Sequence, residues 1–191
     1  MLLAVFLIAF GAMSRLLPHA WNLVPLGALA LFAGSRLPKR LSWAVPVFAM
    51  ILSDIVLDQK NGSYFHSPTR WITYATFALI ALSGVFAKGS KANLFRLGGL
   101  SLVGSTLFFL TSNFGCWAWP EGTNYPMTFA GLMECYTAAL PFFKNTILAD
   151  LIGTAILFSL APIINHAWRQ WLASVPVSTS TDEFGGAVST H

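Results

Sequence analysis

The sequence predicts an all-α, polytopic membrane protein, a bundle of about six transmembrane helices plus a short outer surface helix. Three observations support this prediction. The 191-residue chain is 55% hydrophobic and only 9% charged, with a mean hydropathy of +0.66, whereas soluble domains are about one-quarter charged. Its apolar residues fall into separate runs near the length that crosses a bilayer. Its lysines and arginines gather in alternate connections between those runs.

The apolar runs define the predicted spans. A spanning helix needs about 20 apolar residues, with a lower limit of about 17, and suitable runs lie at Met1–Leu17, Leu23–Leu37, Leu41–Leu57, Trp71–Ala87, Leu94–Thr111 and Thr146–Ile164. The first run lacks the charged start of a cleaved signal peptide, so we expect it to be a retained helix. We expect a transmembrane domain over residues 1–165 and a disordered cytoplasmic tail over 166–191.

The second run, NLVPLGALALFAGSRL, is short and contains Pro25, Gly27 and Gly34. Membrane helices broken in this way often line cavities, because exposed backbone needs polar neighbours. The alternative is a tilted or kinked helix that packs closely through Ala30 and Gly34, two small residues four positions apart. The sequence favours neither interpretation.

The basic residues predict the orientation. They lie in SRLPKR (35–40), in KGSKANLFR (88–96) and at Arg169, and six spans place all three segments on one side. Because short cytoplasmic loops are rich in Lys and Arg, we expect a multi-pass protein of the cell inner (cytoplasmic) membrane with both termini in the cytoplasm. The net charge of +4 then reflects topology rather than binding to nucleic acid.

The opposite, outer side receives the connections 18–22, 58–69 and 113–145. The last is the longest and includes TSNFGCWAWPEGTNYPM (111–127). After it, an apolar face recurs at helical spacing in Phe129, Met133, Tyr136, Leu140 and Phe143. We expect a surface helix there, with a kink at Pro141 before the last span.

Asp54 and Asp58 lie one turn apart at the outer end of the third span. A helix C-terminus disfavours negative charge, so these carboxylates need a cation, and Lys60, Arg70 and Arg15 are the candidates. The pair could bind a cation or a ligand amine, or it could form a salt-bridge cluster that fixes the loops.

Asp150 lies inside the last span, and Thr146 and Thr154 share its helical face. An ionisable group in a spanning segment is costly and usually faces a cavity or a partner. We expect it to face a ligand cavity, or alternatively to anchor the helix by pairing with Lys144 or Arg15.

The outer loop combines aromatic and polar side chains. Trp117, Trp119 and Tyr125 cluster with Asn113 and with Cys116, Glu121 and Asn124. Aromatic residues are common at membrane interfaces without any ligand, but this mixture also suits a lid over a planar ligand.

Three roles are open for Cys116 and Cys135: packed thiols, a disulfide, or, for Cys116 with His19 or His66, a soft metal ligand. The spacing forms no paired-cysteine zinc pattern, and we predict no metal site and no cofactor. The sequence has no serine–histidine–acid or HExxH pattern, so we predict no catalytic residues and no enzyme.

The order of five segments resembles an uncharacterised bacterial family of small six-helix transport proteins. The segments are PHAWNLVPLGALALFAG, LSD at Leu52–Asp54, SNFGCWAWPEGTNYP, GLMECYTAALPFFKNT and ILADLIGTAILF. That family in turn resembles the substrate-binding S components of energy-coupling-factor (ECF) vitamin transporters in size, span number and a Pro/Gly-rich second span. The resemblance extends to about Ile164.

This resemblance implies capture of a small micronutrient, vitamin-like or metal-related, from the extracytoplasmic side. S components usually dock an ATPase-linked module through an AxxxA patch on the first helix, but here Ala4 is followed by Ile8 and Ala9 by Met13. The protein could therefore act alone, or dock through another face such as Ala30 to Gly34.

We expect a small-molecule substrate, the lipid bilayer and an energising module or other membrane subunit as partners, and no nucleic acid. The alternative is a non-catalytic accessory or assembly subunit of a larger membrane complex. The predicted ligand-binding residues are Asn113, Trp117, Trp119, Tyr125, Asn145, Asp150, Asp54, His19 and Asn22.

Overall fold

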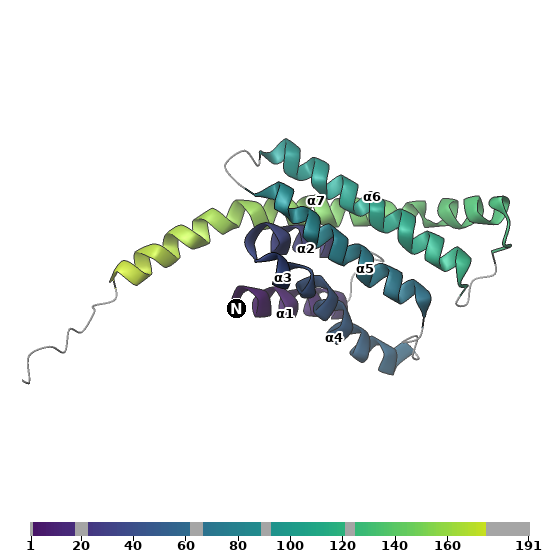
Figure 1. Ribbon diagram of the computed structural model, residues 1–191, viewed down its shortest axis with the longest axis horizontal. Helices are drawn as coiled ribbons and strands as arrows, with labels where there is room; N and C mark the ends of the chain where they lie inside the picture. The colour runs from purple at the N-terminus through teal and green to yellow at the C-terminus, as the bar shows by residue number, and fades with distance from the viewer. Residues whose placement is uncertain (1, 18–22, 62–66, 89–92, 121–124, 175–191) are drawn as a thin grey trace, which may run out of the picture. The chain divides into compact units, whose positions relative to one another are not determined.

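The computed structural model describes residues 2–17, 23–61, 67–88, 93–120 and 125–174, and in these ranges every regular element is a helix (Figure 1). The prediction of an all-α fold is thus confirmed. In chain order, the elements are α1 (Leu2–Leu16), α2 (Leu26–Arg36), α3 (Lys39–Ser42), α4 (Ala44–Asn61), α5 (Pro68–Ser83), the 3-10 helix η1 (Gly84–Ala87), α6 (Leu94–Ala118) and α7 (Phe129–Ser174).

Four segments in the described part of the chain are long and apolar enough to cross a membrane: Lys39–Gln59, Pro68–Ala87, Leu94–Ala118 and Phe129–Ile163. Large apolar side chains on their surfaces are exposed, and Val103 in the middle of α6 is 66% exposed, as expected where a helix meets lipid. These features indicate a membrane-embedded protein. The predicted count of six spans is not confirmed, because α1 and α2 are shorter. The 11 residues of α2 extend about 16 Å, roughly half the hydrocarbon core.

The short helix α2 is the most buried element of the fold. Every residue from Leu26 to Gly34 is buried, and α2 contacts α1, α4, α5 and α6. At its C-terminal end, a Cβ atom at Gly34 would collide with the carbonyl of Ala81 and with Gly84. The close-packing interpretation of α2 is therefore correct at this end. Since Ala30 is fully buried, the idea that Ala30 to Gly34 offers an external docking face is wrong.

The connection between α6 and α7 differs from the prediction. Helix α6 continues to Ala118 and α7 runs unbroken from Phe129 to Ser174, so most of 113–145 is helical and no separate surface helix forms. Only part of the apolar face predicted for that surface helix packs on α6, because Phe129, Met133 and Leu140 of the same face are exposed. Phe109 of α6 stacks on Phe143 with a centroid distance of 4.3 Å and contacts Tyr136 at 5.5 Å. These contacts flank Pro141, which does not end the helix.

The chain divides into two compact units, Met1–Phe158 and Ser159–His191, and everything described below lies in the first. In the second unit, α7 is helical to Ser174, so residues 166–174 are not the disordered tail that the sequence predicts. Residues 175–191 lie outside the described part.

The core of the first unit packs α2, α4 and α5 together. It contains Leu26 and Ala30 of α2, Met50 of α4, and Tyr74, Phe77, Ile80 and Ala81 of α5. Phe77 contacts Phe108 of α6 with a centroid distance of 5.0 Å. Helix α5 begins where its sequence requires: Ser67 accepts the backbone N–H of Arg70, and Pro68 follows at the first helical position.

Candidate functional site

A side chain from α7 caps the N-terminus of α2. Pro25, the residue before α2, provides no side-chain cap, although the first N–H groups of a helix need acceptors. The backbone N–H of Ala28 donates to Oδ1 of Asp150 at 3.1 Å, and the Gly27 amide bonds to the same carboxylate. Ser105 of α6 donates its hydroxyl to Oδ2 at 2.7 Å. Asp150 therefore ties α2, α6 and α7 together.

The surroundings of Asp150 agree with only part of the prediction. Asp150 is 2% exposed, and Thr146 and Thr154 are buried beside it, which confirms that the three residues share an inward face. The predicted anchoring pair with Lys144 or Arg15 is wrong. Arg15 pairs with Asp54 instead, and α2 occupies the place beside Asp150 because its unpaired amides need an acceptor.

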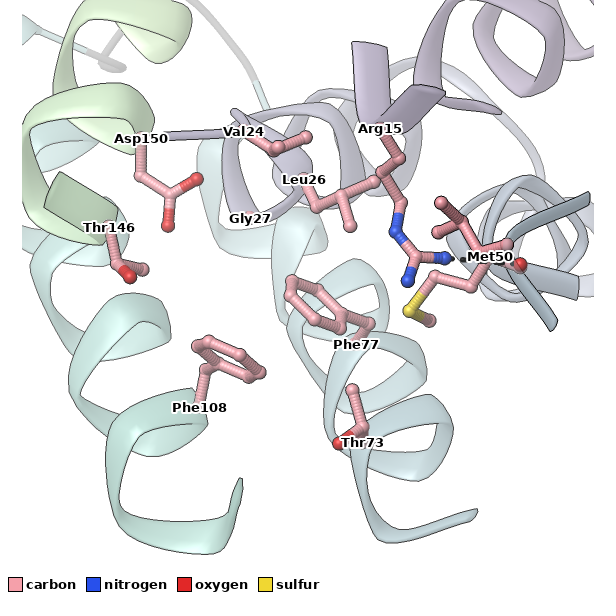
Figure 2. A pocket seen from close by; sticks show the side chains of 11 residues that line it. Arg15, Val24, Leu26, Gly27, Met50, Thr73, Phe77, Phe108, Thr146 and Asp150 are labelled. Atoms are coloured by element: carbon pink, nitrogen blue, oxygen red, sulfur yellow. Dashed lines mark hydrogen bonds between the residues drawn. The ribbon is translucent and has the colours of Figure 1, made fainter. Parts of the chain in front are cut away.

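A cavity of about 360 Å³ opens at this capped helix end. Figure 2 shows Asp150 and Thr146 at one side of it, Arg15 at the other, and the rings of Phe77 and Phe108 along the wall. The remaining lining is mainly aliphatic, from Val24, Leu26, Met50 and Leu57, together with Gly27 and Thr73. Mostly apolar walls with a few placed polar groups are typical of small-molecule sites.

Two further cavities, each of about 270 Å³, adjoin the first. One is lined by Arg15, Asp54, Arg70 and Tyr74, the other by aromatic residues of α6 and α7 with Asn113 and Cys116. Thr73 lines all three cavities. The three cavities therefore meet around the first turns of α5.

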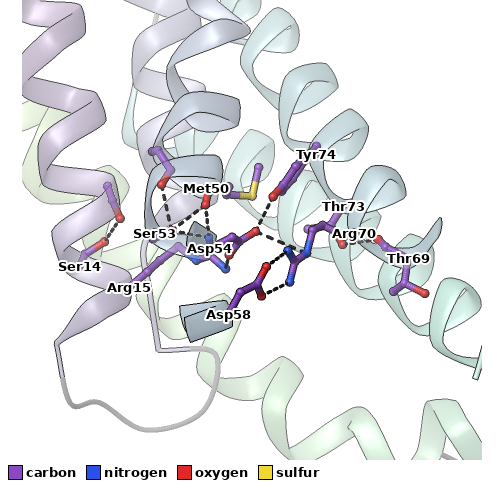
Figure 3. A network of polar contacts seen from close by, with 12 residues as sticks. Ser14, Arg15, Met50, Ser53, Asp54, Asp58, Thr69, Arg70, Thr73 and Tyr74 are labelled. Carbon is purple, nitrogen blue, oxygen red and sulfur yellow. Dashed lines mark hydrogen bonds and ion pairs between the residues drawn. The ribbon is translucent and has the colours of Figure 1, made fainter. Parts of the chain in front are cut away.

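Asp54 and Asp58 belong to an ion-pair network (Figure 3). Arg15 contacts Asp54 at 2.6 Å, and Arg70 binds both oxygens of Asp58 at 2.6 and 2.7 Å. The Tyr74 hydroxyl donates to Asp54 at 2.5 Å. Arg15 and Arg70 are thus confirmed as the compensating cations; the Lys60 side chain lies outside the described part. The network joins α1, α4 and α5, and its Arg15 lines both the main cavity and one of the smaller ones.

The predicted ligand residues do not gather in one place. Asp150, Asp54 and Asn113 each line a different one of the three adjoining cavities. His19 and Asn22 lie outside the described residues.

The four remaining residues line none of these three cavities. Trp117 lies on α6 and donates its indole N–H to the carbonyl of Pro126 at 2.9 Å. Trp119 is 44% exposed, and Tyr125 and Asn145 are half-buried. A lid built from the tryptophans and Tyr125 therefore stays a prediction. The hydrogen bond of Trp117 connects the end of α6 to the segment just before α7.

Cys116 and Cys135 form no disulfide. The Cys135 thiol donates to the carbonyl of Asn113 at 3.5 Å. The disulfide alternative is therefore wrong. Within the described ranges, no group of three His, Cys, Asp or Glu residues could hold a metal ion. His19 and His66, the suggested co-ligands of Cys116, fall outside those ranges.

Sequence reasoning missed several residues of the main cavity. Phe77 and Phe108 look like ordinary apolar helix residues, and no local pattern marks them as cavity walls. Ser105, which donates to Asp150 but does not line the cavity, offered a signal, because it lies four residues after Ser101 in an apolar span. Gly27 was not missed, because it belongs to the short Pro/Gly-rich run for which the sequence gives a cavity lining as one interpretation.

One comparison with known proteins gives a match. Residues 1–172 match the family described as "Family of unknown function (DUF6580)". The chain belongs to this family. The match includes every residue of the main cavity, so the cavity lies within the family's own region. Comparisons with curated proteins and with solved structures found no significant match.

Proposed function

We propose that this protein captures a small solute within its helix bundle and serves membrane transport, in the manner of an ECF S component. The cavity of about 360 Å³ beside the capped end of α2 is the observation that carries the proposal. Its size lies in the range of small-molecule pockets. Its lining combines apolar walls with a buried carboxylate and an arginine.

The short helix α2 supports a transport role. In many transporters, solute sites are built where a short, discontinuous helix ends near the middle of the membrane. Here α2 begins at Leu26, directly after Pro25, and Gly27 lets Asp150 approach its first turn. Non-helical backbone at membrane depth is tolerated when it borders a cavity, and residues 23–25 fit that description.

The basic residues support an opening toward the extracytoplasmic side. With 35–40 and 88–96 in the cytoplasm, the first turns of α5 and the last turns of α1 and α4 point outward. Arg15, Leu57 and Thr73 lie in those turns and line the cavity. We therefore propose a multi-pass inner-membrane protein with cytoplasmic termini. An energising module would need a docking surface other than Ala30 to Gly34.

A cavity-filling variant tests this proposal. Purified wild type, Thr73→Phe and Leu102→Phe are incubated with a protein-free metabolite extract, and bound small molecules are identified by native mass spectrometry. Leu102 is an exposed α6 residue outside the cavity and is the matched control. We expect a bound solute in wild type and Leu102→Phe that Thr73→Phe loses. Absence of any solute in all three, with no thermal stabilisation by the extract, would overturn the proposal.

A second function, a non-catalytic accessory subunit of a larger complex, is favoured by one observation. Asp150 accepts hydrogen bonds from Ala28 of α2 and from Ser105 of α6, so this carboxylate joins three helices and has a structural role that needs no solute. This alternative predicts stable protein partners after mild solubilisation of native membranes and no bound solute. Affinity purification with quantitative proteomics separates the two functions.

A further inference from the structure

The main cavity holds one carboxylate without a counter-charge in the described part of the chain. Asp150 receives hydrogen bonds from Ala28, Gly27 and Ser105, all of which are uncharged groups. The α2 N-terminus offers about half a positive charge, so it offsets the carboxylate only in part. A buried anion inside a spanning segment is costly unless a partner neutralises it.

The other charged groups at the cavity are already balanced among themselves. Arg15 contacts Asp54, and Arg70 contacts both Asp58 and, at 3.8 Å, Asp54. Two guanidinium groups therefore meet two carboxylates, and the network has no net formal charge. The residual negative charge of the cavity thus lies at Asp150, at the end opposite Arg15 (Figure 2).

The cavity lining between Asp150 and Arg15 suits the apolar or aromatic part of a ligand. Phe77 and Phe108 contact each other and line the cavity with aliphatic neighbours. Aromatic faces attract organic cations. Arg15 at the far end is already paired with Asp54 and can only donate hydrogen bonds. It offers no acceptor to a second ammonium group, so the chemistry favours a ligand with one cationic group and an uncharged opposite end.

We propose that the cavity takes a small organic monocation. Its charged nitrogen lies against Asp150 and Thr146, its apolar or aromatic body lies along Phe77 and Phe108, and its uncharged end faces Arg15. This inference rests on the proposed function and names its substrate class. A bare metal ion fits less well, because the described residues contain no cluster of three His, Cys, Asp or Glu ligands and the lining is mostly apolar.

A series of probes with one shared body tests the charge preference. The probes are 4-methylbenzylamine, 4-methylbenzyl alcohol, 4-methylbenzoate and the dication p-xylylenediamine, with sodium and potassium chloride tested alone. Binding to the full chain in lipid nanodiscs is measured by calorimetry and by the shift in thermal unfolding. We expect the monoamine to bind best, the alcohol more weakly, and the benzoate and diamine weakest.

Two variants connect the preference to Asp150. Asp150→Asn keeps an amide oxygen for the Ala28 N–H and removes the charge, so it preserves the cap of α2. Ser101→Ala is the control, because Ser101 is buried one turn from Ser105 and does not line the cavity. We expect Asp150→Asn to weaken binding of the monoamine at least about tenfold, as loss of a charge-assisted contact does. Ser101→Ala should bind the monoamine like wild type.

The outcomes separate this inference from the proposed function. Equal binding of amine and benzoate, unchanged amine binding in Asp150→Asn, or stabilisation by sodium or potassium alone overturns the organic-cation assignment. If the metabolite experiment yields an anionic or neutral solute, the transport proposal stands and this assignment fails. If neither the extract nor any probe binds, both fail.

Discussion

The carboxylate of Asp150 accepts the backbone N–H of Ala28 at 3.1 Å, although the two residues are 122 positions apart in the chain. One contact therefore joins the last long helix to the first turn of the short helix α2. It satisfies amides that Pro25 leaves without a side-chain cap and places a carboxylate at the cavity. The same residue thus stabilises the fold and, in our proposal, binds the charged nitrogen of the ligand.

The cap should be visible as stability. We expect Asp150→Ala to lower the free energy of unfolding by about 2 kcal/mol, because it leaves buried N–H groups unpaired. Asp150→Asn, which retains an acceptor, should cost about 1 kcal/mol or less. Unfolding in mixed micelles measures both, with Glu134→Ala on the exposed side of α7 as control. Equal losses in the Ala and Asn variants would contradict the capping role.

Close packing at the other end of α2 gives a second prediction. A Cβ atom at Gly34 meets the backbone of Ala81 and Gly84, which cannot move as a side chain can. Gly34→Ala should therefore destabilise the protein by about 3 kcal/mol. Gly99→Ala in α6 is the matched control, because nothing lies within 4 Å of its Cβ position, and it should stabilise by up to about 1 kcal/mol. Similar thermal midpoints for the two variants would contradict the close contact of Gly34 with the backbone of Ala81 and Gly84.

Much of the fold could be predicted because it follows from local patterns. Apolar runs predicted the helices, and the four-residue spacing of Thr146, Asp150 and Thr154 predicted their shared buried face. Charge balance near Asp54 correctly identified Arg15 and Arg70 as its neighbours. These predictions needed only periodicity and the cost of an unpaired charge.

The rest depended on contacts between distant segments. Nothing near Asp150 in the sequence indicates that its partners are the first amides of α2. Tyr136 and Phe143 belong to a face that has the spacing of a surface helix, but Phe109 contacts both of them and α7 continues through Pro141. Helix periodicity identifies an apolar face without saying whether lipid, water or another helix covers it.

The two cysteines should behave as thiols. The Cys135 sulfur faces the Asn113 carbonyl and is not bonded to Cys116. The test is to purify the protein without reductant, unfold it in guanidinium and titrate it with a thiol reagent. Two equivalents of thiol per chain should react, one from each of the two cysteines. A value near zero that rises only after reduction would reveal a disulfide. The Cys116→Ser variant, which should give one equivalent, calibrates the assay.

The ion pair between Arg70 and Asp58 should contribute measurably to stability. Its geometry is bidentate, at 2.6 and 2.7 Å, and the side chains are 14% and 16% exposed, so water screens it less than a surface pair. A double-mutant cycle with Arg70→Met and Asp58→Asn should give a coupling free energy of about 1–2 kcal/mol, above the usual value for exposed pairs. Arg96→Met, at an exposed position, should leave the unfolding free energy nearly unchanged. Additive effects of Arg70→Met and Asp58→Asn would show that this ion pair adds no coupling, and the contact between α4 and α5 would then depend on packing alone.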